Sequence, residues 1–545
     1  MKVLIHHLAF QNLGEAPGEG QPTAAGMRSS GWPAQPPGAR RIAWPMWLTS
    51  KSPARARQCL GQAHHAPGRQ PESNQTADRA EHDLGPCRND RIGLLPLEHR
   101  ARNLRRVVEL VEGKRFDSTT RRVDPWLQDA AHLLPDVRAL HLLGLCAQQT
   151  RHYETAVTFL KRAVALTPDD AQLHNNLAAA MRESGALEEG LEHCRRAHAL
   201  SETLIWPLIN MGVIHRDRGE IDKALSAFDR ALALTPDHAD ALWERALAKL
   251  LKGDLKGGFA DYESRLRRHG QQTGIPEPLW RGESLAGRSI LLHAEQGLGD
   301  TIQYARFAPL LASMGAEVYL RVPEPLVHLL KCMDGVTGVV SKASLDTPPV
   351  DFHGLLMSLP YAMGIVDFSE IPSPTNYLRS SASSGVLPAS GFTVGVAWAG
   401  NPSHRNDRNR SMALADLFPL LATSGYRFVS LQVGKPREQI TQLAAEGLIL
   451  DAGRSFRDFA DTADLIAKLD LVVTVDSAPA HLAAAMGKPV WLLLPHAPDW
   501  RWMLGRTDSP WYPSMRLYRQ PVPGDWKSPV AACATDLVRE FRRTD

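Results

Sequence analysis

The first stretch of the chain that could do chemistry is a glycine turn that carries an acid. An apolar run ends at Ala294, and Gly297 and Gly299 then lead to Asp300 and a helical pattern. Glycines let the backbone approach a ligand closely, and a helix start offers unpaired N–H groups to an anion. A carboxylate at the end of a strand in an open sheet lies where ligands bind, so Asp300 is a candidate functional residue. The alternative is that Asp300 only caps its helix.

A second acid, Asp476, follows a buried-strand pattern over 469–475 and precedes a helix of small residues. Ser477 and Ala478 open this helix, and His481 lies one turn further on. Backbone amides and the helix dipole make this start an anion site, for which a diphosphate is the natural ligand. The alternative is an ordinary helix in which Ser477 is the cap and His481 packs in the core.

A third candidate is the basic, amide-rich loop over 399–411. Any of its three arginines could neutralise a phosphate, and Arg410 is favoured because it lies just before the following helix. The alternative is a solvated run of charge. Two aromatic segments, 499–502 and 509–513, either stack a base or sugar or form core and a surface that docks other elements.

Several site motifs are missing from the sequence. Ile302 replaces the third glycine of a dinucleotide fingerprint, and Arg321 stands where ribose recognition needs an acid, which disfavours a nicotinamide enzyme. There is no P-loop, no nucleophile elbow and no H-E-x-x-H. From 288 onward no two Asp residues are spaced i, i+2, and the six cysteines form no C-x-x-C pair. These absences favour a metal-free mechanism.

The elements that must position these residues alternate between strands and helices. Strand-length apolar runs occur at 289–294, 317–322, 392–398, 427–433, 469–475 and 489–494. Helical patterns occur between them at 301–314, 413–421, 437–445 and 457–468. Such alternation predicts parallel sheets covered on both faces. A polar break at 379–390 divides them, so we expect two Rossmann-like halves, 288–380 and 391–545, facing a cleft.

An internal repeat of 34 residues precedes these halves. Small residues recur at one position and bulkier residues at another: Gly144, Ala178, Gly212 and Ala246, and Leu160, Cys194, Phe228 and Tyr262. Small side chains at fixed points let paired helices approach closely. The pattern resembles the tetratricopeptide repeat (TPR) and predicts an α-helical solenoid over 101–270, with about four clear units and one degenerate unit over 101–135. Cys146 and Cys194 are then packing residues, and Arg265 marks the end of the array.

The remaining segments bound the protein's class. Residues 1–98 are rich in Pro and Gly without periodicity, so we expect a disordered extension there, and a connector over 271–287. The formal net charge of +3 gives no field that favours nucleic acid. No apolar run of membrane-spanning length and no export signal is recognised, which predicts a cytoplasmic protein.

The motifs taken together resemble a known family. HAEQGLGDTIQYARFAPLL, GVAWAGNPSHRNDRNRS, VDSAPAHLAAAMGKPVWLLLP and DWRWMLGRTDSPWYP look like bacterial TPR proteins that end in a GT-B glycosyltransferase domain. The catalytic half is similar to the ADP-heptose:lipopolysaccharide heptosyltransferases. The resemblance implies that Asp300 is the general base, and Gly297 and Gly299 of the same turn are expected to bind the donor. It places Asp476, Ser477, Ala478 and His481 near the donor phosphates, with Ala478 where the family has Gly, and Arg410 on the diphosphate.

The expected function is therefore that of a metal-independent glycosyltransferase. A nucleotide-sugar would be the co-substrate, with no other cofactor, and the repeats would select a protein acceptor. One alternative is a non-enzymatic TPR scaffold that carries a degenerate transferase domain. A second alternative is a transferase acting on a lipid-linked glycan or lipopolysaccharide.

Overall fold

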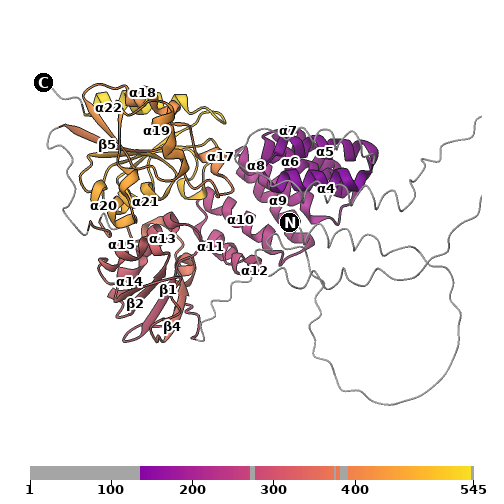
Figure 1. Ribbon diagram of the computed structural model, residues 1–545. Coiled ribbons are helices and arrows are strands. Elements are labelled where there is room, and N and C mark those ends of the chain that lie inside the picture. The colour runs from indigo at the N-terminus through magenta and orange to yellow at the C-terminus, as the bar shows by residue number, and fades with distance from the viewer. Residues whose placement is uncertain (1–135, 270–276, 374–375, 381–390, 542–545) are drawn as a thin grey trace, which may run out of the picture. The chain divides into compact units, whose positions relative to one another are not determined.

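The computed structural model describes residues 136–269, 277–373, 376–380 and 391–541 (Figure 1). The expected N-terminal extension, 1–98, and the degenerate repeat, 101–135, lie outside these residues. In the part of the chain that is described, no helix is long and apolar enough to span a membrane.

The repeat segment forms four successive pairs of packed helices. The pairs are α4 (Val137–Gln149) with α5 (Tyr153–Leu166), α6 (Ala171–Ser184) with α7 (Leu187–Leu200), α8 (Ile205–Asp217) with α9 (Ile221–Leu234), and α10 (Ala239–Lys252) with α11 (Leu255–Tyr262). The small positions lie where helices touch, since a β-carbon at Gly144 would be 2.6 Å from Leu160 Cγ. Cys194 is buried and Cys146 half-buried. The expected TPR solenoid is confirmed.

Local signals begin and end these helices. Asp170 caps α6 by accepting from the N–H groups of Gln172 and Leu173 at 2.8 and 3.1 Å. Gly185 ends the same helix with φ +92°, a left-handed conformation that favours glycine. The last helix, α12 (Arg265–His269), begins at Arg265. The array therefore ends where its small-residue pattern ends.

The N-terminal lobe holds a four-stranded parallel sheet in the order β3-β2-β1-β4. Its strands are β1 (Ser289–His293), β2 (Glu317–Val322), β3 (Gly338–Ser341) and β4 (Phe352–Leu355). Its helices are α13 (Leu298–Ala305), α14 (Phe307–Ser313), η1 (Glu324–Leu326), α15 (Val327–Lys331), η2 (Leu356–Ser358), α16 (Leu359–Ala362) and η3 (Phe368–Glu370). The strand order reverses between β1 and β4, so the carboxyl end of β1 is a place where such sheets bind ligands.

The C-terminal lobe holds a six-stranded parallel sheet in the order β10-β9-β8-β5-β6-β7. Its strands are β5 (Phe392–Ala397), β6 (Tyr426–Ser430), β7 (Ile449–Asp451), β8 (Leu471–Val475), β9 (Val490–Leu494) and β10 (Met515–Arg519). This is the doubly wound Rossmann order, which reverses between β5 and β8. Both reversal points therefore lie directly before the candidate motifs.

Helices cover both faces of this second sheet (Figure 1). One face carries α18 (Phe418–Leu421) and α22 (Lys527–Glu540), and the other carries α20 (Phe459–Ile466) and α21 (Ala478–Ala485). Shorter elements complete the lobe: α17 (Asp407–Arg410), η4 (Leu414–Leu417), η5 (Lys435–Glu438), α19 (Gln439–Gln442), η6 (Gly453–Ser455) and η7 (Trp500–Trp502). The expected α/β domain with two parallel sheets is confirmed.

The structure departs from several expected elements. The helices predicted over 413–421 and 437–445 are each a 3₁₀ turn followed by one short α-helix, η4 with α18 and η5 with α19. The single helix predicted over 301–314 is wrong, because the helix breaks at Arg306 into α13 and α14. Pro309 has no N–H to bond the carbonyl of Ala305, so the ladder cannot continue. Four strands, β3, β4, β7 and β10, are absent from the predicted set; with three to five residues each they carry little periodicity.

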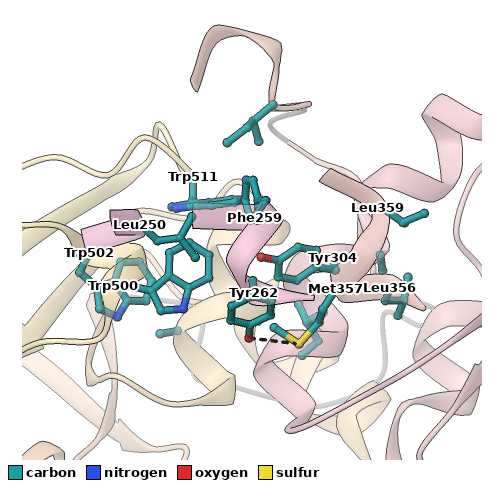
Figure 2. Close-up of a cluster of buried hydrophobic side chains, with 14 of the residues drawn as sticks. Leu250, Phe259, Tyr262, Tyr304, Leu356, Met357, Leu359, Trp500, Trp502 and Trp511 are labelled. Carbon is teal, nitrogen blue, oxygen red and sulfur yellow. Dashed lines mark hydrogen bonds between the residues drawn. The ribbon is translucent and has the colours of Figure 1, made fainter. Parts of the chain in front are cut away.

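One apolar core joins the TPR helices to both lobes. A single cluster of buried side chains runs from α6 through α11 into the two sheets. Figure 2 shows its centre, where Phe259 and Tyr262 of α11 lie near Trp500, Tyr304 and Met357. The centroid of the Trp500 ring lies 6.1 Å from that of the Phe259 ring and 6.2 Å from that of the Tyr262 ring. The end of the repeat array is thus packed into the α/β domain.

Candidate functional site

The turn after β1 places Asp300 in the first turn of α13. Gly297 is the N-cap, and its N–H donates to Asp300 Oδ2 at 2.8 Å. The capping role considered from the sequence is therefore present, with Asp300 at the third helical position. Its side chain is 20% exposed, and its second oxygen, Oδ1, is directed toward the other lobe.

Arg501 of the C-terminal lobe bonds that second oxygen. Its Nη2 donates to Asp300 Oδ1 at 2.5 Å, its Nη1 to Asp499 Oδ1 at 2.8 Å, and its Nε to Gln303 Oε1 at 2.6 Å. The guanidinium is buried, so these three acceptors replace the water that it loses. Sequence reasoning treated 499–502 only as an aromatic segment. The sequence did contain a signal for this contact, an arginine between two tryptophans. Flanking tryptophans indicate that the arginine is buried, and a buried cation needs acidic partners.

The segment after β8 lies at the same lobe interface. A β-carbon added to Gly299 would be 2.8 Å from His481 Cδ2 and 3.6 Å from Ala478 Cα. Glycine at 299 therefore allows α13 of one lobe to touch the start of α21 of the other. Gly299, Asp300, Ala478 and His481, predicted separately from distant motifs, are brought together there.

Ser477 begins α21 but does not cap it through its side chain. Its hydroxyl donates back to the carbonyl of Val475 at 3.1 Å and lies 3.1 Å from the hydroxyl of Thr474. Ser477 is therefore the N-cap residue, as the alternative interpretation has it, but it caps through its backbone carbonyl, which accepts the N–H of Ala480 at 3.0 Å. As the first helical residue, Ala478 has no intrahelical acceptor for its N–H. The helix start retains the donor that an anion would need.

His481 and Asp476 face each other beneath this helix start. His481 Nε2 lies 3.9 Å from Asp476 Oδ1, and His481 Nδ1 lies 3.0 Å from the hydroxyl of Tyr512. Burial, with help from the charge of Arg501, holds the pKa of His481 well below its ordinary value, so the ring is neutral near pH 7. Burial and the negative charge of Asp499 raise the pKa of Asp476 to about 6. His481 is both a packed ring and a polar neighbour of Asp476.

Arg410 is the arginine of the basic loop that faces this region. Its guanidinium lies against Gly400, where an added β-carbon would be 2.7 Å from Nη2, and it pairs with Asp407 at 3.5 Å. Its positive charge acts to lower the pKa of Asp476 and the pKa of His481. Among the residues that the structure describes, its buried Nε has no hydrogen-bond partner. Nε is also the atom that pairs with Asp407, so this donor already faces a carboxylate, and the interpretation of Arg410 as an anion ligand depends on its position and charge.

The other two arginines of the loop contact the repeats instead. Arg408 donates to the carbonyl of Glu183 at 2.7 Å, and Arg405 pairs with the Glu183 carboxylate at 3.5 Å. Arg151 in turn donates to the carbonyls of Pro402 and Ser403 at 2.9 and 3.0 Å. The loop is thus neither a free charge run nor a set of three phosphate ligands.

The last repeat supports the turn that carries Asp300. Arg265 donates from Nε and Nη2 to the two carboxylate oxygens of Glu295 at 3.1 and 2.9 Å, in a buried two-point contact. Gln296 has φ +48°, which non-glycine residues rarely adopt, and its amide donates to the hydroxyl of Tyr262 at 2.9 Å. These contacts hold the residues directly before Gly297 in place.

The aromatic segments form core rather than an exposed stacking platform. Trp500, Trp502, Trp511 and Tyr512 are all buried. Trp500 packs on Trp511, with 5.7 Å between the ring centroids, and also on α11 (Figure 2). The docking interpretation of these segments is the one that the structure supports. No group of three or more His, Cys, Asp or Glu side chains suited to a metal occurs among the described residues.

Comparison with known proteins matches both parts of the chain. Residues 438–496 match the model of glycosyltransferase family 9 (heptosyltransferase), and TPR models match 137–170, 169–237 and 209–272. The matched transferase segment contains Asp476, Ser477, Ala478 and His481.

One curated relative matches most of the chain, and solved structures match a shorter part of it. The chain is 26% identical over 474 residues to Protein FlbA of Caulobacter vibrioides, covering 73% of this chain and 78% of that protein. Among solved structures, a thermophilic TPR protein of Thermus thermophilus, TTC0263, is 24% identical, with 32% of this chain and 93% of that chain covered and a TM-score of 0.25. MamA is 21% identical, with 27% and 88% covered and a TM-score of 0.24.

Proposed function

We propose that this chain, which combines TPR repeats with a glycosyltransferase family 9 domain, transfers a hexose- or heptose-like sugar from a nucleotide-sugar to a protein bound by the repeats. The family match over 438–496 supports the transferase class. The observation that carries the proposal is the meeting of Asp300 and Gly299 with the start of α21 at the lobe interface. An acid and an anion-binding helix start from two lobes are the groups that glycosyl transfer needs.

The donor side of the proposed reaction is the C-terminal lobe. As the bond between the anomeric carbon and the diphosphate oxygen breaks, negative charge gathers on the leaving nucleoside diphosphate. The N–H of Ala478, the positive end of the α21 dipole and Arg410 would stabilise that charge. Ser477 and Asp476 shape the helix start, and neutral His481 packs beneath it.

The acceptor side is the glycine turn of the N-terminal lobe. Asp300 would take the proton of the acceptor group as that group bonds the anomeric carbon, a role worth about 10²- to 10⁴-fold in rate. Each of its oxygens already accepts one bond, from Arg501 and from the N–H of Gly297. A carboxylate has about four lone-pair sites, so the acceptor group can still reach it.

The proposal also covers the cofactors of the reaction and its cellular compartment. The groups above supply acid–base and charge-stabilising functions, so the proposed mechanism uses no metal and no cofactor besides the nucleotide-sugar. We place the reaction in the cytoplasm, where nucleotide-sugars are made available to a protein acceptor.

The test combines nucleotide binding with turnover. Isothermal titration with a panel of nucleoside diphosphates is expected to find one that binds specifically, and Asp300→Asn is expected to keep that binding and lose most turnover of the matching nucleotide-sugar. Asp416→Asn is the matched control, because Asp416 also accepts the N–H of the residue three positions before it, at 3.0 Å, but lies on η4. Both variants replace a carboxylate that accepts the N–H of the residue three positions earlier. Only Asp300→Asn removes the proposed base, so only this variant should lose activity.

Other outcomes separate the alternatives. Absence of specific binding by every nucleoside diphosphate would support a non-enzymatic scaffold. Unchanged turnover in Asp300→Asn would remove Asp300 from the mechanism. Intact-mass comparison of candidate acceptor proteins with and without the enzyme tests the acceptor class, and transfer only to a lipid-linked glycan would contradict the protein acceptor.

A further inference from the structure

A cavity of about 590 Å³ opens on the TPR helices, away from the strand ends that carry the proposed transferase site. It lies between α7 and α9, the second helices of two successive repeats, with α8 behind them. Arg195 and His198 come from α7, and Lys223, Ser226 and Arg230 from α9. A cavity of this size holds a few side chains of a peptide.

The cavity is rich in cations that have weak partners. Among the residues that the structure describes, Arg195 pairs at the surface with Glu192 of its own helix at 3.0 Å, and Lys223 pairs with Glu220 at 3.4 Å. Exposed pairs of this kind are worth little and exchange readily. Arg230 directs its guanidinium to His198 rather than to a carboxylate.

The acidic residue that lines the cavity is already neutralised. The carboxylate of Asp222 is bonded by Lys252 at 2.6 Å. His215, which also lines the cavity, is bonded to Glu220 at 2.6 Å. The cations on α7 and α9 therefore outweigh the negative charge facing them.

His198 adds a donor that lacks an acceptor. Arg230 Nη2 lies 3.0 Å from His198 Nε2, and because a guanidinium only donates, Nε2 is the acceptor. The ring proton of neutral His198 is therefore on Nδ1. That atom is buried and has no hydrogen-bond partner in the described part of the chain. Arg230 is therefore held by an uncharged acceptor and keeps its own positive charge available to a carboxylate in the cavity.

We propose that this cavity binds an acidic segment of a partner protein, whose Asp or Glu side chains pair with Arg195 and Arg230. Carboxylates match the excess of cations on α7 and α9. The chain's own residues 1–135 are unsuited to the role because they carry more Lys and Arg than Asp and Glu. The inference does not depend on the transferase activity, since no residue of the lobe interface takes part.

Fluorescence anisotropy on the full chain tests this site. A labelled peptide of alternating Glu and Ser is expected to bind more tightly than the same peptide with Gln for Glu, and added salt should weaken only the Glu peptide. Arg195→Ala and Arg230→Ala should each weaken it about threefold to fivefold.

Arg196→Ala is the matched control. Arg196 follows Arg195 on α7 and is equally exposed, at 50% against 53%, but it pairs with Asp169 at 2.7 Å. Its replacement should leave peptide affinity unchanged. Equal binding of the Gln peptide, or equal losses in Arg195→Ala and Arg196→Ala, would overturn the proposal. Inorganic phosphate competing as tightly as the peptide would show a simple anion site and would overturn it too.

Discussion

Arg501 and Asp300, which are 201 residues apart in the sequence, form a 2.5 Å ion pair between the two lobes. The arginine side chain is 7% exposed and the aspartate 20%, so water screens the pair little. The residue proposed as the base is thus also a point where the lobes are held together.

Replacing Arg501 should destabilise the protein. Arg501→Met leaves Asp300 and Asp499 beside an apolar side chain, and breaking a buried pair in this way costs about 3–5 kcal/mol. Chemical denaturation would show the loss. Arg506→Met is the control, since Arg506 pairs with exposed Asp508 and should change stability by less than about 1 kcal/mol. Equal losses of stability in both variants would mean that the interlobe pair contributes no more than an exposed ion pair.

Asp476 should make stability depend on pH in the acid range. Its pKa is raised to about 6 in the folded chain, above the ordinary value of 3.8, so the folded state holds the proton more tightly. Stability should therefore fall as pH rises from about 4 to 6, by up to about 3 kcal/mol from this group. Asp476→Asn should lack that fall. Melting temperatures of both proteins across this range test it, and parallel curves would contradict the assignment.

The contact at Gly299 predicts a steric effect at the lobe interface. Gly299→Ala brings a β-carbon to 2.8 Å from His481 Cδ2, which forces α13 and α21 apart. Overpacking of this kind costs about 1–3 kcal/mol, and the displaced lobes should lose turnover. Gly447→Ala is the control, because no atom lies within 4 Å of its added β-carbon. Thermal melts and transfer assays should separate the two variants.

Arg265 should act as a positioning residue for the glycine turn. Arg265→Met removes the two-point contact with Glu295 and should lower turnover while nucleoside diphosphate binding in the other lobe persists. Arg265→Lys keeps the charge without the two-point geometry and should restore part of the activity. Arg267→Met, at an exposed arginine that pairs with Asp237 at 3.6 Å, is the control. Loss of nucleotide binding together with turnover would indicate a general folding defect instead.

Much of the fold follows from local patterns in the sequence. The 34-residue spacing of small residues such as Gly144 is sufficient to predict the helix pairs, because close helix approach requires them at fixed positions. Alternating strands and helices predict parallel sheets, and in such sheets Asp300 and Asp476 must follow strand ends. Family resemblance and the alternation of strands and helices together therefore single out the candidate residues from the sequence.

Tertiary structure alone decided which of these residues meet and what else joins them. Arg501 binding Asp300, Arg408 bonding the Glu183 carbonyl and Arg265 holding Glu295 are contacts between distant segments. Periodicity and turn signals act over a few residues, so they describe single elements and contain no information on which faces pack together. Packing of the last repeat and the two lobes into one core sets those distances.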